Sequence, residues 1–224
     1  MYKLAIFDFD GTLVDSTPGI IDVMRDVVKE YNFDEEIIEE WQHLVGVPLP
    51  KQMEIIFPDN DAAFHLEVAN RYRAIYDTKA IEICPPFPHM ADLLKNLKNA
   101  GVVVTIASSK RSNLVQVVID HHNLNEYFAM VVGAQEVTNH KPHPESVHIT
   151  VEKLAMTHDD AVVIGDSIFD LDMAKNAGVD AIGVTTGVHT KAMLERSAPT
   201  HIVSDLQEVE RLILKGKNGK GSAY

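Results

Sequence analysis

The apolar residues of this chain form two kinds of pattern, short continuous runs and longer segments with helical spacing. From residue 90 onward the two kinds alternate along the sequence. Short apolar runs bounded by turn residues are typical of strands buried on both faces of a sheet. Strands are predicted at residues 3–9, 102–107, 129–132, 161–164 and 181–184. Helices are predicted between and after the later strands at residues 90–100, 112–121, 144–154, 169–177, near 193 and at 206–214. This alternation predicts an α/β fold with a parallel, Rossmann-like sheet core.

A long stretch after the first strand lacks any strand pattern and has helical spacing instead. Thr17 is expected to cap the first helix there, with Pro18 at its first position. Further helices are predicted at residues 35–44, 49–56 and 62–76. The segment 84–89 contains three prolines, which resist helix, and is expected to return the chain to the sheet.

These patterns divide the chain into a core and an insertion. The catalytic core is predicted to comprise residues 1–15 and 85–214, with an all-helical cap domain at residues 16–84. The glycine- and lysine-rich tail at 215–224 is expected to be disordered.

Charge and cysteine content narrow the class of partner. The 33 acidic residues outnumber the 20 basic ones, and the formal charge of −13 disfavours binding to nucleic acid or to an anionic membrane. Cys84 is the only cysteine, so no intrachain disulfide is possible and a cytoplasmic location is expected. No apolar segment approaches the length of a membrane span. A small anionic substrate therefore fits best, bound with local compensation by a metal or a lysine; the protein is expected to be a monomer or a homodimer.

Polar residues gather where the predicted strands end. They are Asp8 and Asp10 after the first strand, Ser108 and Ser109 after the second, Lys141 beyond the third and Asp166 after the fourth. The carboxyl ends of parallel strands form the ligand crevice of an open sheet, so these groups are expected to converge. Clustered carboxylates repel one another unless a cation lies between them, and Mg²⁺ favours such oxygen ligands together with substrate phosphate. Lys141 and the serine hydroxyls would supply the positive charge and donors that a phosphoryl group needs.

Four motifs in order resemble those of the haloacid dehalogenase superfamily. They are DFDGTLVDS at residues 8–16, IASS at 106–109, the lysine of HKPHPE at 141, and GDSIFD at 165–170. The resemblance extends from about residue 2 to 214, and four ordered motifs are far more specific than one.

The resemblance implies covalent catalysis by two aspartates. Asp8 would attack phosphorus and become an aspartyl phosphate. Asp10 would protonate the leaving oxygen and then deprotonate the water that hydrolyses the intermediate. The carboxylates of Asp8 and Asp166 and the main-chain carbonyl of Asp10 would hold Mg²⁺, and Asp170 would orient a metal-bound water.

The same resemblance implies a phosphate site. Ser108 would donate a hydrogen bond to a phosphoryl oxygen, with Ser109 as a further donor, and Lys141 would neutralise charge on Asp8 and on the transferred group. Gly11 would let the backbone bring amide donors to the phosphate. Thr12 and Asp15 are expected to stabilise the turn.

The inserted helices resemble the small cap of this superfamily, which presents specificity residues to the core. The loop at residues 43–52 would face the active site. Gly46, Lys51 and Arg73 are therefore candidates for contact with the leaving group. His189 is assigned no role.

These features predict a magnesium-dependent phosphatase for a small phosphorylated metabolite of the phosphoglycolate type. An inorganic pyrophosphatase and a phosphomutase of the β-phosphoglucomutase type remain alternatives. A non-catalytic binding module is disfavoured because all three aspartates, at positions 8, 10 and 166, are present. A dinucleotide-binding oxidoreductase is disfavoured because no GxGxxG follows the first strand.

Overall fold

The computed structural model describes residues 1–216 and contains a six-stranded sheet in the order β3-β2-β1-β4-β5-β6. All neighbouring strands are parallel. The strands are β1 (Leu4–Phe7), β2 (Val103–Ala107), β3 (Phe128–Val132), β4 (Ala161–Gly165), β5 (Asp180–Val184) and β6 (His201–Val203). The strand order reverses beside β1, which makes the carboxyl end of this strand the expected ligand crevice.

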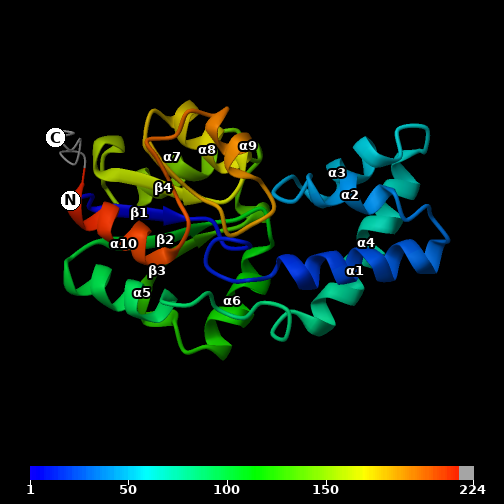
Figure 1. Ribbon diagram of the computed structural model, residues 1–224, viewed down its shortest axis with the longest axis horizontal. Coiled ribbons are helices and arrows are strands. Elements are labelled where there is room, and N and C mark those ends of the chain that lie inside the picture. The colour runs from blue at the N-terminus through cyan, green and yellow to red at the C-terminus, as the bar shows by residue number, and fades with distance from the viewer. Residues whose placement is uncertain (217–224) are drawn as a thin grey trace.

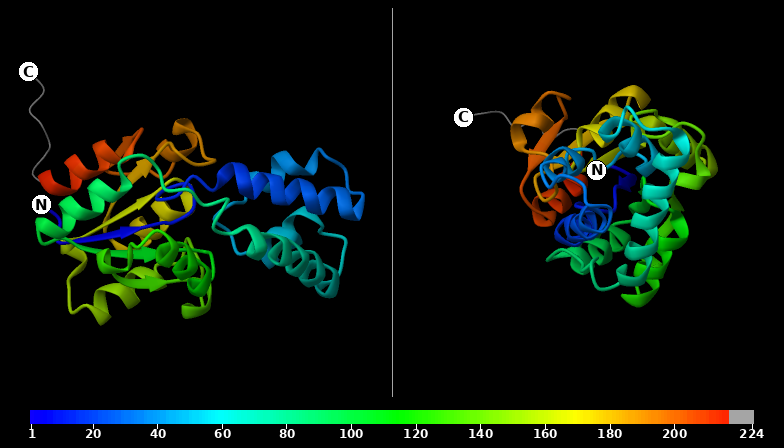
Figure 2. Two further views of the ribbon diagram at one scale, coloured as in Figure 1. Left: turned by 90° about the horizontal axis from the view of Figure 1, so that it is seen from below. Right: turned by 90° about the vertical axis from the view of Figure 1, so that its right-hand side faces the viewer.

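Helices cover both faces of the sheet, as Figure 2 shows. They are α5 (Met90–Asn99), α6 (Ser112–His121), α7 (Glu145–Lys153), α8 (Ile168–Ala177), α9 (Lys191–Glu195) and α10 (Leu206–Lys215). Side chains of β1 alternate between two apolar clusters: Ala5 and Phe7 pack with α5 and α10, whereas Leu4 and Ile6 pack with α7 and α8. This period of two, with both faces apolar, explains why the strand reads as a continuous apolar run.

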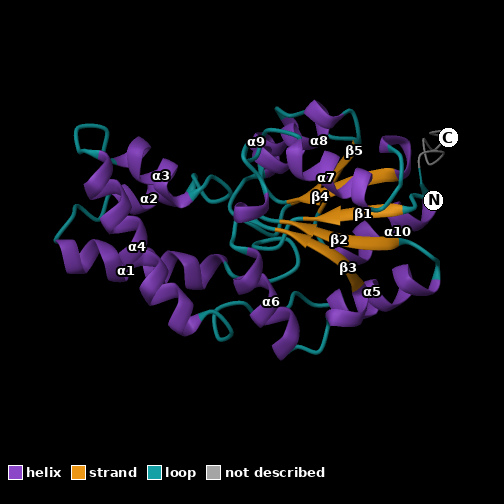
Figure 3. Ribbon diagram, turned by 180° about the vertical axis from the view of Figure 1, so that it is seen from behind, coloured by secondary structure: helices purple, strands orange, loops and turns teal. Residues whose placement is uncertain are grey.

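Four further helices lie together to one side of the sheet, at its carboxyl edge (Figure 1). They are α1 (Thr17–Tyr31), α2 (Ile37–Gln42), α3 (Leu49–Ile56) and α4 (Ala62–Lys79). Figure 3 shows the strand arrows pointing towards these helices. Trp41 and Met53 are fully buried among them, and the Trp41 indole donates to Gln52 Oε1 at 2.7 Å. The helices thus have apolar contacts of their own, consistent with the predicted insertion, whose boundaries stay a prediction.

Several details differ from the sequence predictions. The strand β1 and the helix α2 are shorter than the predicted 3–9 and 35–44. Thr17 is the first residue of α1, and the cap position belongs to Ser16, whose hydroxyl donates instead to Asp10 Oδ1 at 2.7 Å. The strand β6 was not predicted, because its three residues pair on one side only and form too short a pattern. The helix α4 continues beyond the predicted residue 76 to Lys79.

The predicted disordered tail falls largely on residues 217–224, which lie outside the described residues. Within residues 1–216, no helix has the length and apolar character needed to cross a bilayer.

Candidate active site

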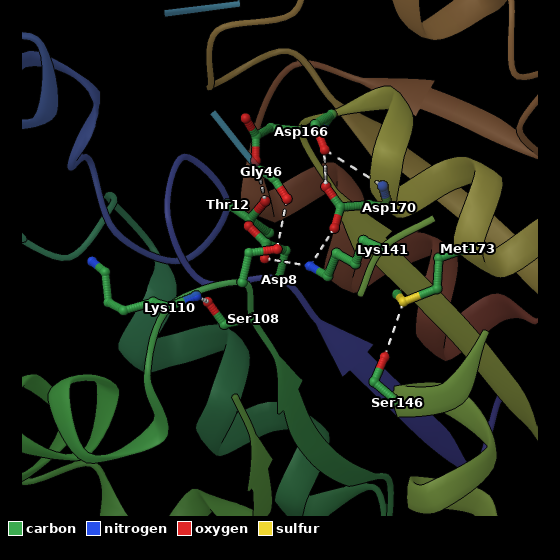
Figure 4. A network of polar contacts seen from close by, with 12 residues as sticks. Asp8, Thr12, Gly46, Ser108, Lys110, Lys141, Ser146, Asp166, Asp170 and Met173 are labelled. Carbon is green, nitrogen blue, oxygen red and sulfur yellow. Dashed lines mark hydrogen bonds and ion pairs between the residues drawn. The ribbon is translucent and has the colours of Figure 1, made fainter. Parts of the chain in front are cut away.

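Residues far apart in the sequence meet at the carboxyl edge of the sheet, around a buried lysine (Figure 4). Asp8 directly follows β1, and Lys141 comes from the loop between β3 and α7. The Lys141 ammonium lies 2.6 Å from Asp8 Oδ1 and 2.5 Å from Asp170 Oδ1. Only 5% of the Lys141 side chain and 11% of the Asp8 side chain are exposed. The two carboxylates therefore share one cation in a region that is largely closed to water.

The carboxylates outnumber that cation. Oxygen atoms of Asp8, Asp166 and Asp170 all lie within 4.8 Å of one another. Burial raises the pKa of Asp8 to about 7, although Lys141 opposes the change. Burial, with repulsion from Asp8 and Asp170, raises the pKa of Asp166 well above its usual range. A hard divalent cation would relieve this repulsion, and the carboxylate oxygens are the ligand type that Mg²⁺ prefers.

Asp166 is held in a fixed orientation. The Thr12 hydroxyl donates to Asp166 Oδ1 at 2.9 Å. A Cβ on Gly11 would lie 2.7 Å from Asp166 Oδ2, and Gly11 has a φ of +74°. Both observations explain the residue types in this turn: only glycine fits the backbone and the close approach, and threonine supplies the donor. Thr12, predicted to stabilise the turn, thus also orients a candidate metal ligand.

Asp170 contacts Lys141 and the start of its own helix. Its Oδ1 pairs with Lys141, and its Oδ2 accepts from the Ser167 hydroxyl at 2.5 Å and from the Ser167 main-chain amide at 3.2 Å. These contacts fix the position of the Lys141 ammonium beside Asp8. The predicted role of Asp170 towards a metal-bound water stays a prediction.

Asp10 stands apart from the group of three carboxylates. Its Oδ1 accepts from the Ser16 hydroxyl at 2.7 Å and pairs with Lys110 Nζ at 2.6 Å. The Lys110 ammonium also contacts the Tyr76 hydroxyl and lies 4.4 Å from the Tyr76 ring centroid. Sequence reasoning missed Lys110, although it directly follows the IASS motif and could have been found by that adjacency. In Figure 4 its side chain extends away from Lys141.

The two serines after β2 have different surroundings. Ser108 is buried, and its hydroxyl oxygen accepts from the Lys110 main-chain amide at 3.1 Å, so its proton is free to point elsewhere. Ser109 donates to the Gly46 carbonyl at 2.6 Å. The Ser108 hydroxyl thus keeps its proton available for another acceptor, whereas the Ser109 hydroxyl already donates to the loop that carries Gly46.

The loop at residues 43–52 makes a second contact with the part of the molecule that contains the sheet, through His189. The main-chain amide of Ile168 donates to His189 Nδ1 at 3.0 Å, so the ring proton is on Nε2, which donates to the His43 carbonyl at 3.1 Å. Burial lowers the pKa of His189, which favours this neutral form. His189, which had no predicted role, therefore joins α8 to the loop at residues 43–52.

A cavity of about 860 Å³ lies between this loop, helix α4 and the carboxyl edge of the sheet. Asp10 and Lys141 line it from one side, and Gly46, Lys51 and Arg73 line it from the other. The predicted loop and its three candidate residues therefore do adjoin the site. Lys51 is exposed and pairs with Glu54 at 2.6 Å.

The chain is similar to known proteins over most of its length. The family model for haloacid dehalogenase-like hydrolases matches residues 5–184. A Dickeya dadantii protein named probable phosphatase IndB is 33% identical over 213 residues, covering 93% of this chain and 92% of that protein. A Vibrio parahaemolyticus phosphoglycolate phosphatase is 26% identical and covers 94% of this chain and 96% of its own length. A solved Clostridium acetobutylicum structure, described as a predicted phosphatase, superposes with a TM-score of 0.86 at 25% identity, over 96% of this chain and 99% of that one.

The chain belongs to the haloacid dehalogenase-like hydrolase family. The predicted superfamily and the predicted parallel α/β fold are thereby confirmed.

Proposed function

We propose that this protein is a magnesium-dependent phosphatase that hydrolyses a small phosphorylated metabolite through an aspartyl phosphate on Asp8. The observation that carries the proposal is the buried pair of Asp8 and Lys141, 2.6 Å apart at the end of the central strand. A carboxylate held there beside a fixed ammonium group is placed to receive a phosphoryl group, whose negative charge the ammonium stabilises.

The reaction divides into two steps carried by this chain's own residues. Asp8 attacks phosphorus, the bond to the leaving oxygen breaks, and Asp10 protonates that oxygen. Asp10 then takes a proton from water, which attacks the aspartyl phosphate and releases inorganic phosphate. Because Oδ1 of Asp10 is held by Ser16 and Lys110, Oδ2 is the oxygen that exchanges the proton.

The remaining residues neutralise charge and bind the phosphoryl oxygens. Asp8, the main-chain carbonyl of Asp10 and Asp166 would hold Mg²⁺, which supplies charge neutralisation when bound. Ser108 and Lys141 donate to the phosphoryl group.

A metabolite of the phosphoglycolate type is the first candidate substrate, supported by the relative of that name. Inorganic pyrophosphate hydrolysis and a β-phosphoglucomutase-type transfer are the alternatives, and we place the activity in the cytoplasm, in keeping with the single buried cysteine.

Phosphate release measured with Mg²⁺ and with a chelator tests the proposal. The panel contains phosphoglycolate, pyrophosphate, sugar phosphates, nucleotides and acetyl phosphate. Asp8→Asn should stay folded and lose turnover, whereas Asp59→Asn, at an exposed site, should retain it. Substantial magnesium-dependent hydrolysis by Asp8→Asn would show that Asp8 is not the nucleophile. Phosphoryl exchange that needs a bisphosphate, without net phosphate release, would favour the mutase.

A further inference from the structure

The cavity beside Asp10 is larger and more apolar than glycolate requires. We propose that the leaving group of the natural substrate is an uncharged alcohol with a broad apolar face, larger than glycolate. This inference rests on the proposed phosphatase function and concerns the same site, but it replaces phosphoglycolate as the first candidate substrate.

Size is the first argument. The cavity of about 860 Å³ adjoins Asp10, the group that would protonate the leaving oxygen, and Lys141, which would bind the phosphoryl group. Cavities of roughly 300–1,000 Å³ in proteins typically enclose ligands much larger than a two-carbon acid. Glycolate would leave most of this space without contacts.

The character of the lining is the second argument. Apolar side chains line the cavity from both sides: Ile20, Met24, Val45, Val47 and Leu49 from the helical side, and Phe169 from α8. Val45, Val47, Leu49 and Phe169 are only partly buried in the protein itself. An apolar face on the leaving group would remove the exposed parts of these side chains from water, which stabilises the complex.

Charge is the third argument. Three cations that line the cavity within residues 1–216 are each paired with a carboxylate. The pairs are Lys51 with Glu54, Lys110 with Asp10, and Arg111 with Asp77. Each pair has an N–O distance of 2.6 Å. A carboxylate on the leaving group would have to compete with an existing partner or with repulsion from these acids.

Lys141, which also lines the cavity, is paired with Asp8 and Asp170 and would bind the phosphoryl group, so Arg73 is the further cation to consider. Its Nη1 donates to the neutral Asn70 Oδ1 at 2.9 Å, and Asp77, which is already bound by Arg111, is nearby. A carboxylate-bearing substrate would therefore depend on Arg73, which makes the two kinds of leaving group separable by experiment.

Four substrates that are all phosphate esters of primary alcohols test the inference: benzyl phosphate, adenosine 5′-monophosphate, ribose 5-phosphate and phosphoglycolate. Because all four are esters of primary alcohols, their leaving oxygens are chemically similar. Differences in kcat/KM therefore report how well the rest of each leaving group fits the cavity. Benzyl phosphate or adenosine 5′-monophosphate should exceed phosphoglycolate at least tenfold. Ribose 5-phosphate, which lacks an apolar ring, should fall below adenosine 5′-monophosphate.

A pair of variants on α3 locates the effect. Leu49→Trp fills the cavity and should lower the ratio of kcat/KM for benzyl phosphate to that for acetyl phosphate at least tenfold. Ile55→Trp, on the same helix, at a residue that is 40% exposed and outside the cavity, should leave that ratio unchanged.

Two results would overturn the inference while leaving the phosphatase intact. One is a preference for phosphoglycolate that Arg73→Gln abolishes, and the other is hydrolysis of acetyl phosphate with no turnover of either ring-bearing substrate. Failure to hydrolyse acetyl phosphate as well, with Mg²⁺ present, would instead contradict the proposed function on which the inference rests.

Discussion

Replacing Gly187 with alanine tests how closely the loop after β5 confines Asp166. An ideal Cβ at this position would lie 1.7 Å from Asp166 Oδ2, 2.3 Å from its Cγ and 2.7 Å from its Cβ. Ordinary contacts between such atoms are about 3.5 Å or more, so the carboxylate would have to move by roughly 2 Å. Because the overlap includes the Cβ of Asp166, rotation of the carboxylate alone cannot relieve it.

The cost follows from what holds Asp166 in place. Moving its carboxylate breaks the 2.9 Å hydrogen bond from Thr12 and displaces a candidate Mg²⁺ ligand. A hydrogen bond to a charged group contributes about 1.5–3 kcal/mol. If the free energy of this hydrogen bond no longer holds the Asp166 carboxylate in its metal-binding orientation, Mg²⁺ affinity falls by about tenfold to a hundredfold. Each 1.4 kcal/mol corresponds to about a factor of ten in affinity.

The assay is the Mg²⁺ dependence of phosphate release at fixed substrate, with the Mg²⁺-induced rise in Tm as a second readout. Gly101→Ala is the matched control, because Gly101 has a φ of +78° and no atom within 4 Å of an added Cβ. It should lose about 1–2 kcal/mol of stability from backbone strain and keep its Mg²⁺ constant. A folded Gly187→Ala protein with an unchanged Mg²⁺ constant would refute the proposed place of Asp166 in the metal site.

Two further predictions concern charge at the site. Burial raises the pKa of Asp8 from 3.8 to about 7, so the folded metal-free protein binds a proton more tightly than the unfolded chain does. The stability that this group contributes is therefore fully present below about pH 4 and is lost as the pH rises through 7. In chelator, Tm should fall between about pH 4 and 7, and Mg²⁺ should restore it most at the higher pH. A Tm in chelator that rises over this range, or an equal fall in Asp8→Asn, would contradict the assignment. The Lys110 ammonium holds Oδ1 of Asp10, the residue proposed to protonate the leaving oxygen. Lys110→Met should therefore lower kcat/KM for alkyl phosphates by about tenfold or more. It should lower kcat/KM for acetyl phosphate less, because acetyl phosphate depends little on proton donation. An exposed Lys95→Met control should change neither, and equal losses on both substrates would show that Lys110 acts only structurally.

Much of the fold follows from local pattern. The apolar run at residues 3–9 predicted a buried strand, and β1 within it, at Leu4–Phe7, is buried at all four residues. The helix predictions at 49–56 and 112–121 coincide with α3 and α6. The short edge strand β6 escaped prediction because His201 and its two neighbours are only partly buried and form no distinctive pattern. Cap positions were also harder, because Ser16 is bonded to Asp10 rather than to its own helix.

The sequence alone determined which carboxylates, hydroxyls and lysine follow the strands, and hence which superfamily this protein belongs to. The ends of parallel strands lie at one edge of a sheet, so residues that follow such strands meet there. The local strand pattern was therefore enough to predict that these residues meet. Only the tertiary structure decided the contacts made by long side chains and loops, such as Lys110 with Asp10, His189 with the His43 carbonyl, and Ser109 with Gly46. Those contacts join segments more than 60 residues apart, and no local periodicity encodes them. The contacts of Ser109 and His189 also depend on how the four helices α1–α4 lie against the sheet.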